Sequence, residues 1–160
     1  MPVILKALKP KESDFEPQNL GEHIHRCRLL RQLNQKEAAC QLGVKSWTVL
    51  NWEKGHTEPP IESMPAILQF LGYDPYPKPK TLSERMFAKR RAMGWSILEA
   101  AWQLGVEQGT WGAWERGETI LLRRHRALVA RFLELAAEEI QREMRDRWNR
   151  SHARTPGKKT

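Results

Sequence analysis

The chain has 160 residues, of which 29% are charged and 40% are hydrophobic, and its formal net charge is +8. No apolar run of about 18 residues occurs, which excludes a membrane-spanning helix, and two cysteines are too few for a disulfide framework. The first residues lack the apolar core of a signal peptide, so we expect a cytoplasmic protein. The basic excess lies mainly in residues 141–160, and a basic protein of this kind commonly binds a polyanion.

Most of the chain is a repeat. Residues 20–71 and 82–133 align without a gap and share 17 identical residues. Two copies of one small module therefore account for most of the protein. The expected organisation is a flexible N-terminal arm (1–19), domain 1 (20–74), a Pro-rich linker (75–80), domain 2 (81–135), and a C-terminal helix extension with a basic tail (136–160).

In the first copy, apolar residues that recur every three or four positions predict a first helix. Asn34, followed three residues later by Glu37, resembles the capping box that begins a helix, and Gly43 is a residue type that ends one. A further helix is expected to stop at Gly55, and Pro65 suits the first turn of the next. The predicted helices cover residues 20–32, 35–42, 46–54 and part of 61–71.

The second copy follows the same plan, and two of its helices begin with the S/T-x-x-E form of a capping box, at Thr81 and Ser96. Its fourth helix lacks the proline, so we expect it to continue unbroken from about residue 122 to residue 148. Neither copy has the alternating pattern of a β-strand. The predicted fold class is all-α.

Two segments carry a more specific pattern. Residues 35–55 read QKEAACQLGVKSWTVLNWEKG, and the second copy repeats it with EAAWQLGV at residues 99–106 and WERG at residues 114–117. This pattern resembles the helix-turn-helix of the Cro/phage-repressor (XRE) family. The resemblance implies two tandem lambda-repressor-like domains of four to five helices each, the second extended by a long C-terminal helix. It also implies a regulator that binds double-stranded DNA in the cytoplasm, either bacterial and associated with the nucleoid or encoded by a phage.

The family resemblance assigns an ion pair to each copy. An arginine on the first helix pairs with the glutamate that closes the recognition helix. Here these are Arg28 with Glu53, and Arg90 with Glu115, each pair 25 residues apart. We interpret both pairs as structural and neither glutamate as catalytic.

The resemblance also implies which residues of the first copy contact DNA. Asn51 is chemically suited to adenine, because its amide can bind N6 and N7 together. Trp47 is less usual: it either packs on a thymine methyl group or the sugar-phosphate wall, or it packs against its own domain. The base-contacting residues expected are Lys45, Ser46, Trp47 and Asn51, and the phosphate contacts are Gln35, Lys54 and His56.

In the second copy the corresponding surface is altered, because Glu107 and Gly109 stand where the first copy has Lys45 and Trp47. The contacts that remain are Gln108, Thr110 and Arg116. Two interpretations stay open. Either this copy binds an adjacent half-site loosely, so that one chain mimics a dimer, or it has become a protein-contact module.

The C-terminal segment has an apolar stripe that continues beyond the expected end of domain 2. Ile140, Met144 and Trp148 lie on this stripe and should need a partner. A homodimer contact through this helix and folding back onto the first copy are both open. The arginines beside the stripe would bind phosphates or another acidic surface.

The leading hypothesis is a sequence-specific DNA-binding regulator, a repressor that occupies an operator and reads the major groove mainly with the recognition helix of domain 1. The alternative is an adaptor or antitoxin-like protein whose helix-turn-helix domains contact protein. No motif predicts an enzyme, a cofactor or a metal site, and we expect no small-molecule ligand and no membrane partner.

Overall fold

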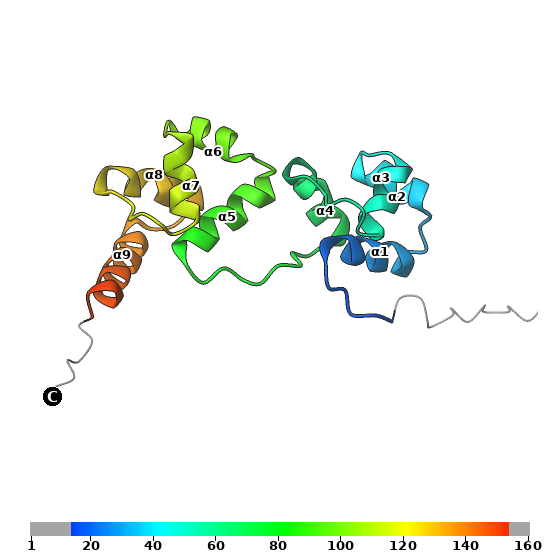
Figure 1. Ribbon diagram of the computed structural model, residues 1–160, viewed down its shortest axis with the longest axis horizontal. Helices are drawn as coiled ribbons and strands as arrows, with labels where there is room; N and C mark the ends of the chain where they lie inside the picture. The colour runs from blue at the N-terminus through cyan, green and yellow to red at the C-terminus, as the bar shows by residue number, and fades with distance from the viewer. Residues whose placement is uncertain (1–13, 154–160) are drawn as a thin grey trace, which may run out of the picture. The chain divides into compact units, whose positions relative to one another are not determined.

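The computed structural model describes residues 14–153. The beginning of the predicted N-terminal arm and the last residues of the predicted basic tail lie outside this range. The described residues form nine α-helices and one 3-10 helix, and no β-strand occurs among them (Figure 1). The predicted all-α class is therefore confirmed. Within the same residues, no helix is both long and apolar enough to cross a bilayer.

The chain divides between Pro77 and Lys78 into two compact units, which we call unit 1 and unit 2. The division falls inside the segment expected to be a linker, residues 75–80. Each predicted repeat therefore lies in a unit of its own. Each unit also has its own cluster of buried hydrophobic side chains.

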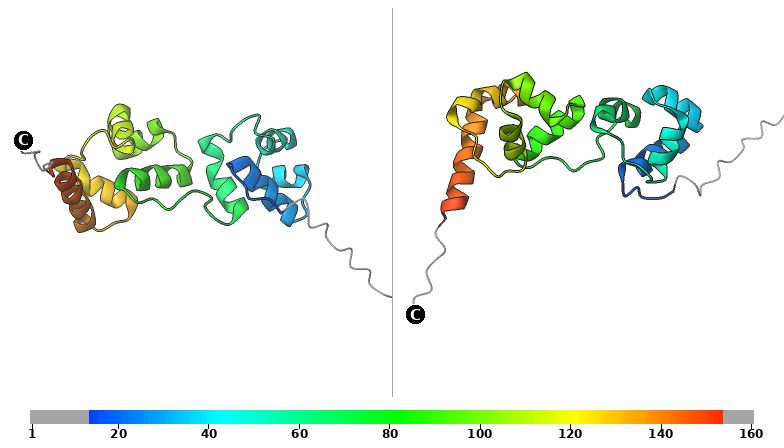
Figure 2. Two further views of the ribbon diagram at one scale, coloured as in Figure 1. Left: turned by 60° about the horizontal axis from the view of Figure 1, so that its bottom comes forward. Right: turned by 45° about the horizontal axis from the view of Figure 1, so that its top comes forward.

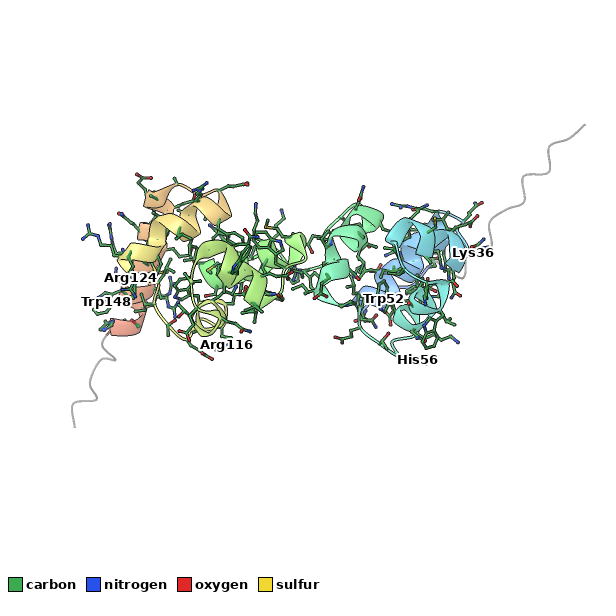
Figure 3. All side chains as sticks on the ribbon, turned by 90° about the horizontal axis from the view of Figure 1, so that it is seen from above. Lys36, Trp52, His56, Arg116, Arg124 and Trp148 are labelled. Carbon is green, nitrogen blue, oxygen red and sulfur yellow. The ribbon has the colours of Figure 1, made fainter. Side chains whose placement is uncertain are left out.

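Unit 1 contains four α-helices around one core. Ile24, Val49 and Ile67 come from three different helices and are fully buried at its centre. Trp52 is also buried, at 3% exposure, and Figure 3 shows it inside the unit, with Lys36 and His56 toward the margins. The helices are α1 (Leu20–Leu30), α2 (Gln35–Leu42), α3 (Ser46–Glu53) and α4 (Met64–Leu71), with a 3-10 turn (Ile61–Ser63) before α4.

Local signals in the sequence set the ends of α2. The Asn34 side chain accepts a hydrogen bond from the backbone N–H of Glu37 at 2.9 Å, and the Glu37 carboxylate accepts from the backbone N–H of Asn34 at 2.7 Å. This capping box satisfies two N–H groups that a helix start otherwise leaves without partners. Gly43 ends the helix with φ +68°, a left-handed conformation that a side chain would strain.

Unit 2 repeats these elements and adds one helix. Its first helix begins with a capping box between Thr81 and Glu84, and its second with one between Ser96 and Glu99. Trp111 is fully buried at its centre. The helices are α5 (Leu82–Met93), α6 (Ile97–Leu104), α7 (Gln108–Glu115), α8 (Arg123–Leu133) and α9 (Ala137–His152).

The prediction of one unbroken helix over residues 122–148 is wrong. Glu134 adopts a left-handed conformation with φ +58° and ends α8. Leu133 and Leu135, on either side of it, both pack against the core of unit 2. A straight helix could not keep both of these residues in the core and also bring α9 back onto it.

The homodimer role predicted for Ile140 and Met144 is also contradicted, because both side chains lie in the core of unit 2, at 0% and 6% exposure. Two polar contacts hold α9 there: the Glu143 carboxylate accepts from the backbone N–H of Leu82, and Arg147 donates to the carbonyl of Gly117. These residues belong to the core of unit 2, and they do not form an extension that requires a partner. The three views in Figures 1 and 2 show α9 at the end of unit 2.

Trp148, the third residue of the predicted contact, stays 53% exposed. Its ring stacks on His152, with the ring centroids 3.6 Å apart. A homodimer contact through α9 stays a prediction, and among the three residues first assigned to it, Trp148 alone is accessible.

Candidate nucleic-acid interface

An ion pair joins α1 to the end of α3 in unit 1. The Arg28 guanidinium donates from Nε and Nη2 to the two carboxylate oxygens of Glu53, at 2.6 and 2.9 Å. Arg28 also donates to the carbonyl of Leu33, in the turn before α2, at 2.9 Å. This one side chain therefore ties together the three segments that fix the position of α3.

Gln35 takes part in the same cluster. Its side-chain Nε2 donates to a carboxylate oxygen of Glu53 at 3.2 Å, a contact that no sequence pattern predicts. Gln35 was expected to contact a phosphate from the start of α2, and that role is untested. Its amide is half-buried and held by Glu53, so it offers fewer free hydrogen-bond donors than an unrestrained glutamine would.

The first turn of α3 is open to solvent. Lys45, Ser46 and Trp47 are all exposed, and Lys45 caps the helix without any side-chain hydrogen bond. No acidic residue lies in this turn, so the positive end of the helix dipole is not offset locally. Such an end favours an anionic partner.

Trp47 does not pack against its own domain, since 66% of its surface is accessible. Its side chain borders a shallow hollow of about 510 Å³ at the turn between α2 and α3. Two lysines, Lys36 and Lys45, lie on the same rim. The hollow thus combines apolar surface with positive charge, and its lining residues are Lys36, Ala39, Cys40, Val44, Lys45, Ser46 and Trp47.

Asn51 does not face outward as expected, because only 9% of its surface is exposed. In the turn after α3, the backbone N–H of His56 donates to the Asn51 carbonyl at 2.9 Å, and that of Thr57 does so at 3.5 Å. These bonds fold the turn back over the end of the helix. The prediction that Asn51 belongs to the open face of α3 is wrong in this respect.

Lys54 and His56 are both exposed and lie in the turn that follows α3. Neither forms an ion pair with a described residue. They lie at the opposite end of α3 from Lys45 and Ser46. Side chains at the two ends of a helix that lies in a groove of DNA can each contact a phosphate of the backbone beside that groove.

Unit 2 retains the scaffold of this arrangement. Arg90 donates from Nε and Nη2 to Glu115 at 2.6 and 2.8 Å, and from Nη1 to the Trp95 carbonyl at 2.8 Å. The third donor to the glutamate differs between the units. In unit 2 the indole Nε1 of Trp111 donates to Glu115 at 2.6 Å, whereas the position of Gln35 is taken by Ile97.

The outer surface of this motif differs more strongly between the units. Leu98 and Trp102 replace Lys36 and Cys40, and they are 60% and 77% exposed. Of the predicted DNA contacts, Gln108 is exposed and Thr110 is half-buried. In unit 2 the exposed apolar surface therefore lies on α6, at Leu98 and Trp102, while the first turn of α7 begins with an exposed acid at Glu107.

Arg116 is exposed but has an acidic partner. It donates to both carboxylate oxygens of Glu118, at 2.7 and 2.9 Å. This carboxylate raises the pKa of Arg116, and the guanidinium in turn lowers the pKa of Glu118. The pair offers little net charge to a phosphate, so the geometry weakens the DNA contact predicted for Arg116.

The comparison with known proteins concerns unit 1. Residues 24–77 match the profile of a family described as Helix-turn-helix. Unit 1 is a helix-turn-helix domain. The match confirms the resemblance to the Cro/phage-repressor (XRE) family for this part of the chain, and it supports a DNA-binding transcription regulator in general.

The matched range ends at residue 77. That unit 2 is a second helix-turn-helix domain stays a prediction, which rests on the repeat and on the Arg90–Glu115 pair. No curated protein and no solved structure gives a significant match to the chain.

Proposed function

We propose that this chain is a sequence-specific regulator of transcription, a repressor that occupies an operator and reads the major groove of DNA mainly with α3 of unit 1. The observation that carries the proposal is the open first turn of α3. Lys45, Ser46 and Trp47 are exposed there, and no acid offsets the positive helix end. An α-helix presented in this way fits the major groove of B-DNA.

The division of roles follows from chemistry and position. Ser46 and Trp47 contact base edges, Ser46 by hydrogen bonds and Trp47 through apolar contact with a thymine methyl group. Lys45 and Lys54 neutralise phosphates, His56 hydrogen-bonds a phosphate oxygen, and all three contribute affinity that does not depend on sequence. Gln35 adds a phosphate contact at the start of α2, through the hydrogen-bond donor of its side chain that Glu53 does not occupy. Asn51 is left out of the base-reading set because of its burial.

The proposal is tested by selecting bound fragments from random duplex DNA with the full chain, and by measuring affinity for the selected site and for a scrambled one. Trp47→Ala should reduce the ratio of the two affinities by about tenfold, since one good base contact is worth roughly 1–3 kcal/mol. Lys54→Gln should weaken binding to both sequences alike. No sequence preference at any salt concentration would rule the proposal out.

Gln108→Ala provides the matched control, because Gln108 holds the position in unit 2 that Ser46 holds in unit 1. If unit 1 supplies the base contacts, this change leaves discrimination unaltered while Ser46→Ala lowers it. Equal losses from both changes would mean that both units read bases. The selected site would then have two parts.

A second candidate function is suggested by the apolar face of unit 2. Leu98 and Trp102 are four residues apart on α6, on one side of the helix, and both are largely exposed. An adaptor or antitoxin-like protein would use such a face to bind another protein. If this is the function, the chain binds a partner protein in stoichiometric amount, and Trp102→Ser abolishes that binding. Altering Trp47 would then have no effect on any property that depends on DNA.

A further inference from the structure

Much of the unpaired positive charge of unit 2 lies on α8 and α9, away from α7. Four cations elsewhere in the unit have acidic partners: Arg85 with Glu139, Lys89 with Glu134, and the two arginine–glutamate pairs already described. On α8 and α9, by contrast, six arginines are exposed and form no ion pair with any described acid: Arg123, Arg124, Arg131, Arg142, Arg145 and Arg150.

A hollow of about 300 Å³ brings two arginines of different helices together. Arg126 reaches it from α8 and Arg145 from α9, and the exposed Trp148 forms part of its wall. The Arg126 Nε donates to the Leu121 carbonyl at 3.4 Å, which holds the base of this side chain. None of the lining residues is acidic: they are Ile120, Arg126, Gln141, Met144, Arg145 and Trp148.

Two guanidinium groups beside one hollow repel each other unless an anion lies between them. The first turn of α8 adds to this positive field. It carries Arg123 and Arg124, has no acid and has no side-chain cap, although cations are unfavourable at the positive end of a helix dipole. A bound anion would offset both unfavourable arrangements.

We propose that the hollow between α8 and α9 holds a backbone phosphate of duplex DNA, so that unit 2 contacts DNA through these two helices and not through α7. The guanidinium groups of Arg126 and Arg145 grip the phosphate oxygens, and the ring of Trp148 packs on the adjoining sugar. Arg123 and Arg142 are exposed and lie three residues before Arg126 and Arg145 on the same sides of α8 and α9, and they contact further phosphates.

The proposal rests on the proposed function, because it takes DNA as the partner of the chain. The arrangement favours a duplex backbone over a single small anion, since further exposed arginines, Arg123 and Arg142, lie one turn from those that line the hollow. Figure 3 places Arg124 and Trp148 at the same end of unit 2, with Arg116 apart from them. A phosphate contact on this side leaves the exposed residues of α7 free for another role.

The test uses the full chain, a fluorescent duplex of about 30 base pairs with unselected sequence, and anisotropy titrations at several salt concentrations. The double variant Arg126→Gln/Arg145→Gln should weaken binding about tenfold at physiological salt and lower the slope of log affinity against log salt by about 1, because one phosphate contact is lost. Replacing both arginines by lysine should restore most of the affinity. Circular dichroism checks that each variant is folded.

The matched control is Arg85→Gln/Lys89→Gln, which removes the same charge from unit 2 at positions that have acidic partners. This control should bind nearly as the native chain does. Equal weakening by both double variants would mean a general effect of net charge and would overturn the inference. Stronger binding of a single strand than of a duplex by the same arginines would also overturn it.

The two proposals fail in different ways. If the native chain binds no duplex at any salt concentration, the proposed function itself is wrong. If it binds duplex DNA and the Arg126→Gln/Arg145→Gln variant binds equally well, only the contact through α8 and α9 is wrong.

Discussion

Arg28 and Glu53 form a two-pronged hydrogen-bonded ion pair, although 25 residues separate them in the chain. The side chains are 11% and 4% exposed, so neither charge is well solvated without the other. Unit 2 contains the same pair as Arg90 and Glu115, at 6% and 8% exposure. Each pair fixes the helix after the turn against the first helix of its unit.

Removing one partner should leave a buried charge without compensation. We expect Arg28→Met to lower the free energy of unfolding by about 3–5 kcal/mol, measured by urea denaturation of the full chain. The double variant Arg28→Met/Glu53→Leu should recover much of this loss, because no charge is then left unpaired. Arg116→Met is the control: it breaks an exposed pair and should leave the unfolding midpoint unchanged.

The burial of Met144 makes a prediction that separates a core role from a dimer contact. Met144→Ala should lower the free energy of unfolding by about 2–5 kcal/mol, because it leaves a cavity in the core of unit 2. The native chain and the variant should sediment as the same species in analytical ultracentrifugation. If the variant is as stable as the native chain but less associated, Met144 is an interface residue after all.

Two glycines should respond in opposite directions to the same substitution. A Cβ at Gly21 would lie 1.8 Å from the backbone oxygen of Trp52, so Gly21→Ala forces α1 and α3 apart and should cost about 1–3 kcal/mol or more, as overpacking a core does. At Gly109, in the first turn of α7, a Cβ would meet no atom within 4 Å apart from its chain neighbours and the backbone of its own helix. Gly109→Ala should therefore stabilise the chain by about 0.4–1 kcal/mol, as measured by thermal unfolding.

The capping box of α6 predicts a pH effect. Hydrogen bonds from the backbone and the side chain of Ser96 lower the pKa of Glu99 below its ordinary value. The stabilisation from this cap is therefore complete above the ordinary pKa of a glutamate, and it is lost as the pH falls through the lowered one. An NMR titration of the side-chain carboxyl carbons should show this directly, and Ser96→Ala should move the pKa of Glu99 back upward. A Glu99 that titrates at or above the ordinary value would contradict the cap.

Most helix ends could be predicted from the sequence because short-range chemistry determines them. Asn34 with Glu37 and Ser96 with Glu99 each place a side-chain acceptor beside free backbone N–H groups, and this requires only a spacing of three residues. The buried ion pairs could be predicted from two other observations: the family resemblance, and the spacing of 25 residues that occurs in both copies. Both kinds of signal are present in the order of residues alone.

The corrections concern features that depend on tertiary packing. Glu134 ends α8 without a glycine, because the core of unit 2 requires Leu133 and Leu135 to pack on it from either side of a break. Asn51 has the helical phase of an outward residue, yet it is 9% exposed in the folded unit. The hollow between Arg126 and Arg145 likewise exists only once α9 has packed against α8. No local sequence pattern predicts any of these three features.

The third donor to the buried glutamate comes from a different position in each unit. In unit 1 this hydrogen bond comes from Gln35, and Val49 fills the adjacent core position; in unit 2 Trp111 fills that position and supplies the bond itself, while Ile97 is apolar. The two differences compensate for each other, so that each buried glutamate keeps three donors. Trp111→Val alone would leave the Glu115 carboxylate with one donor fewer, whereas Ile97→Gln alone would bring a fourth donor near it, which a carboxylate can still accept.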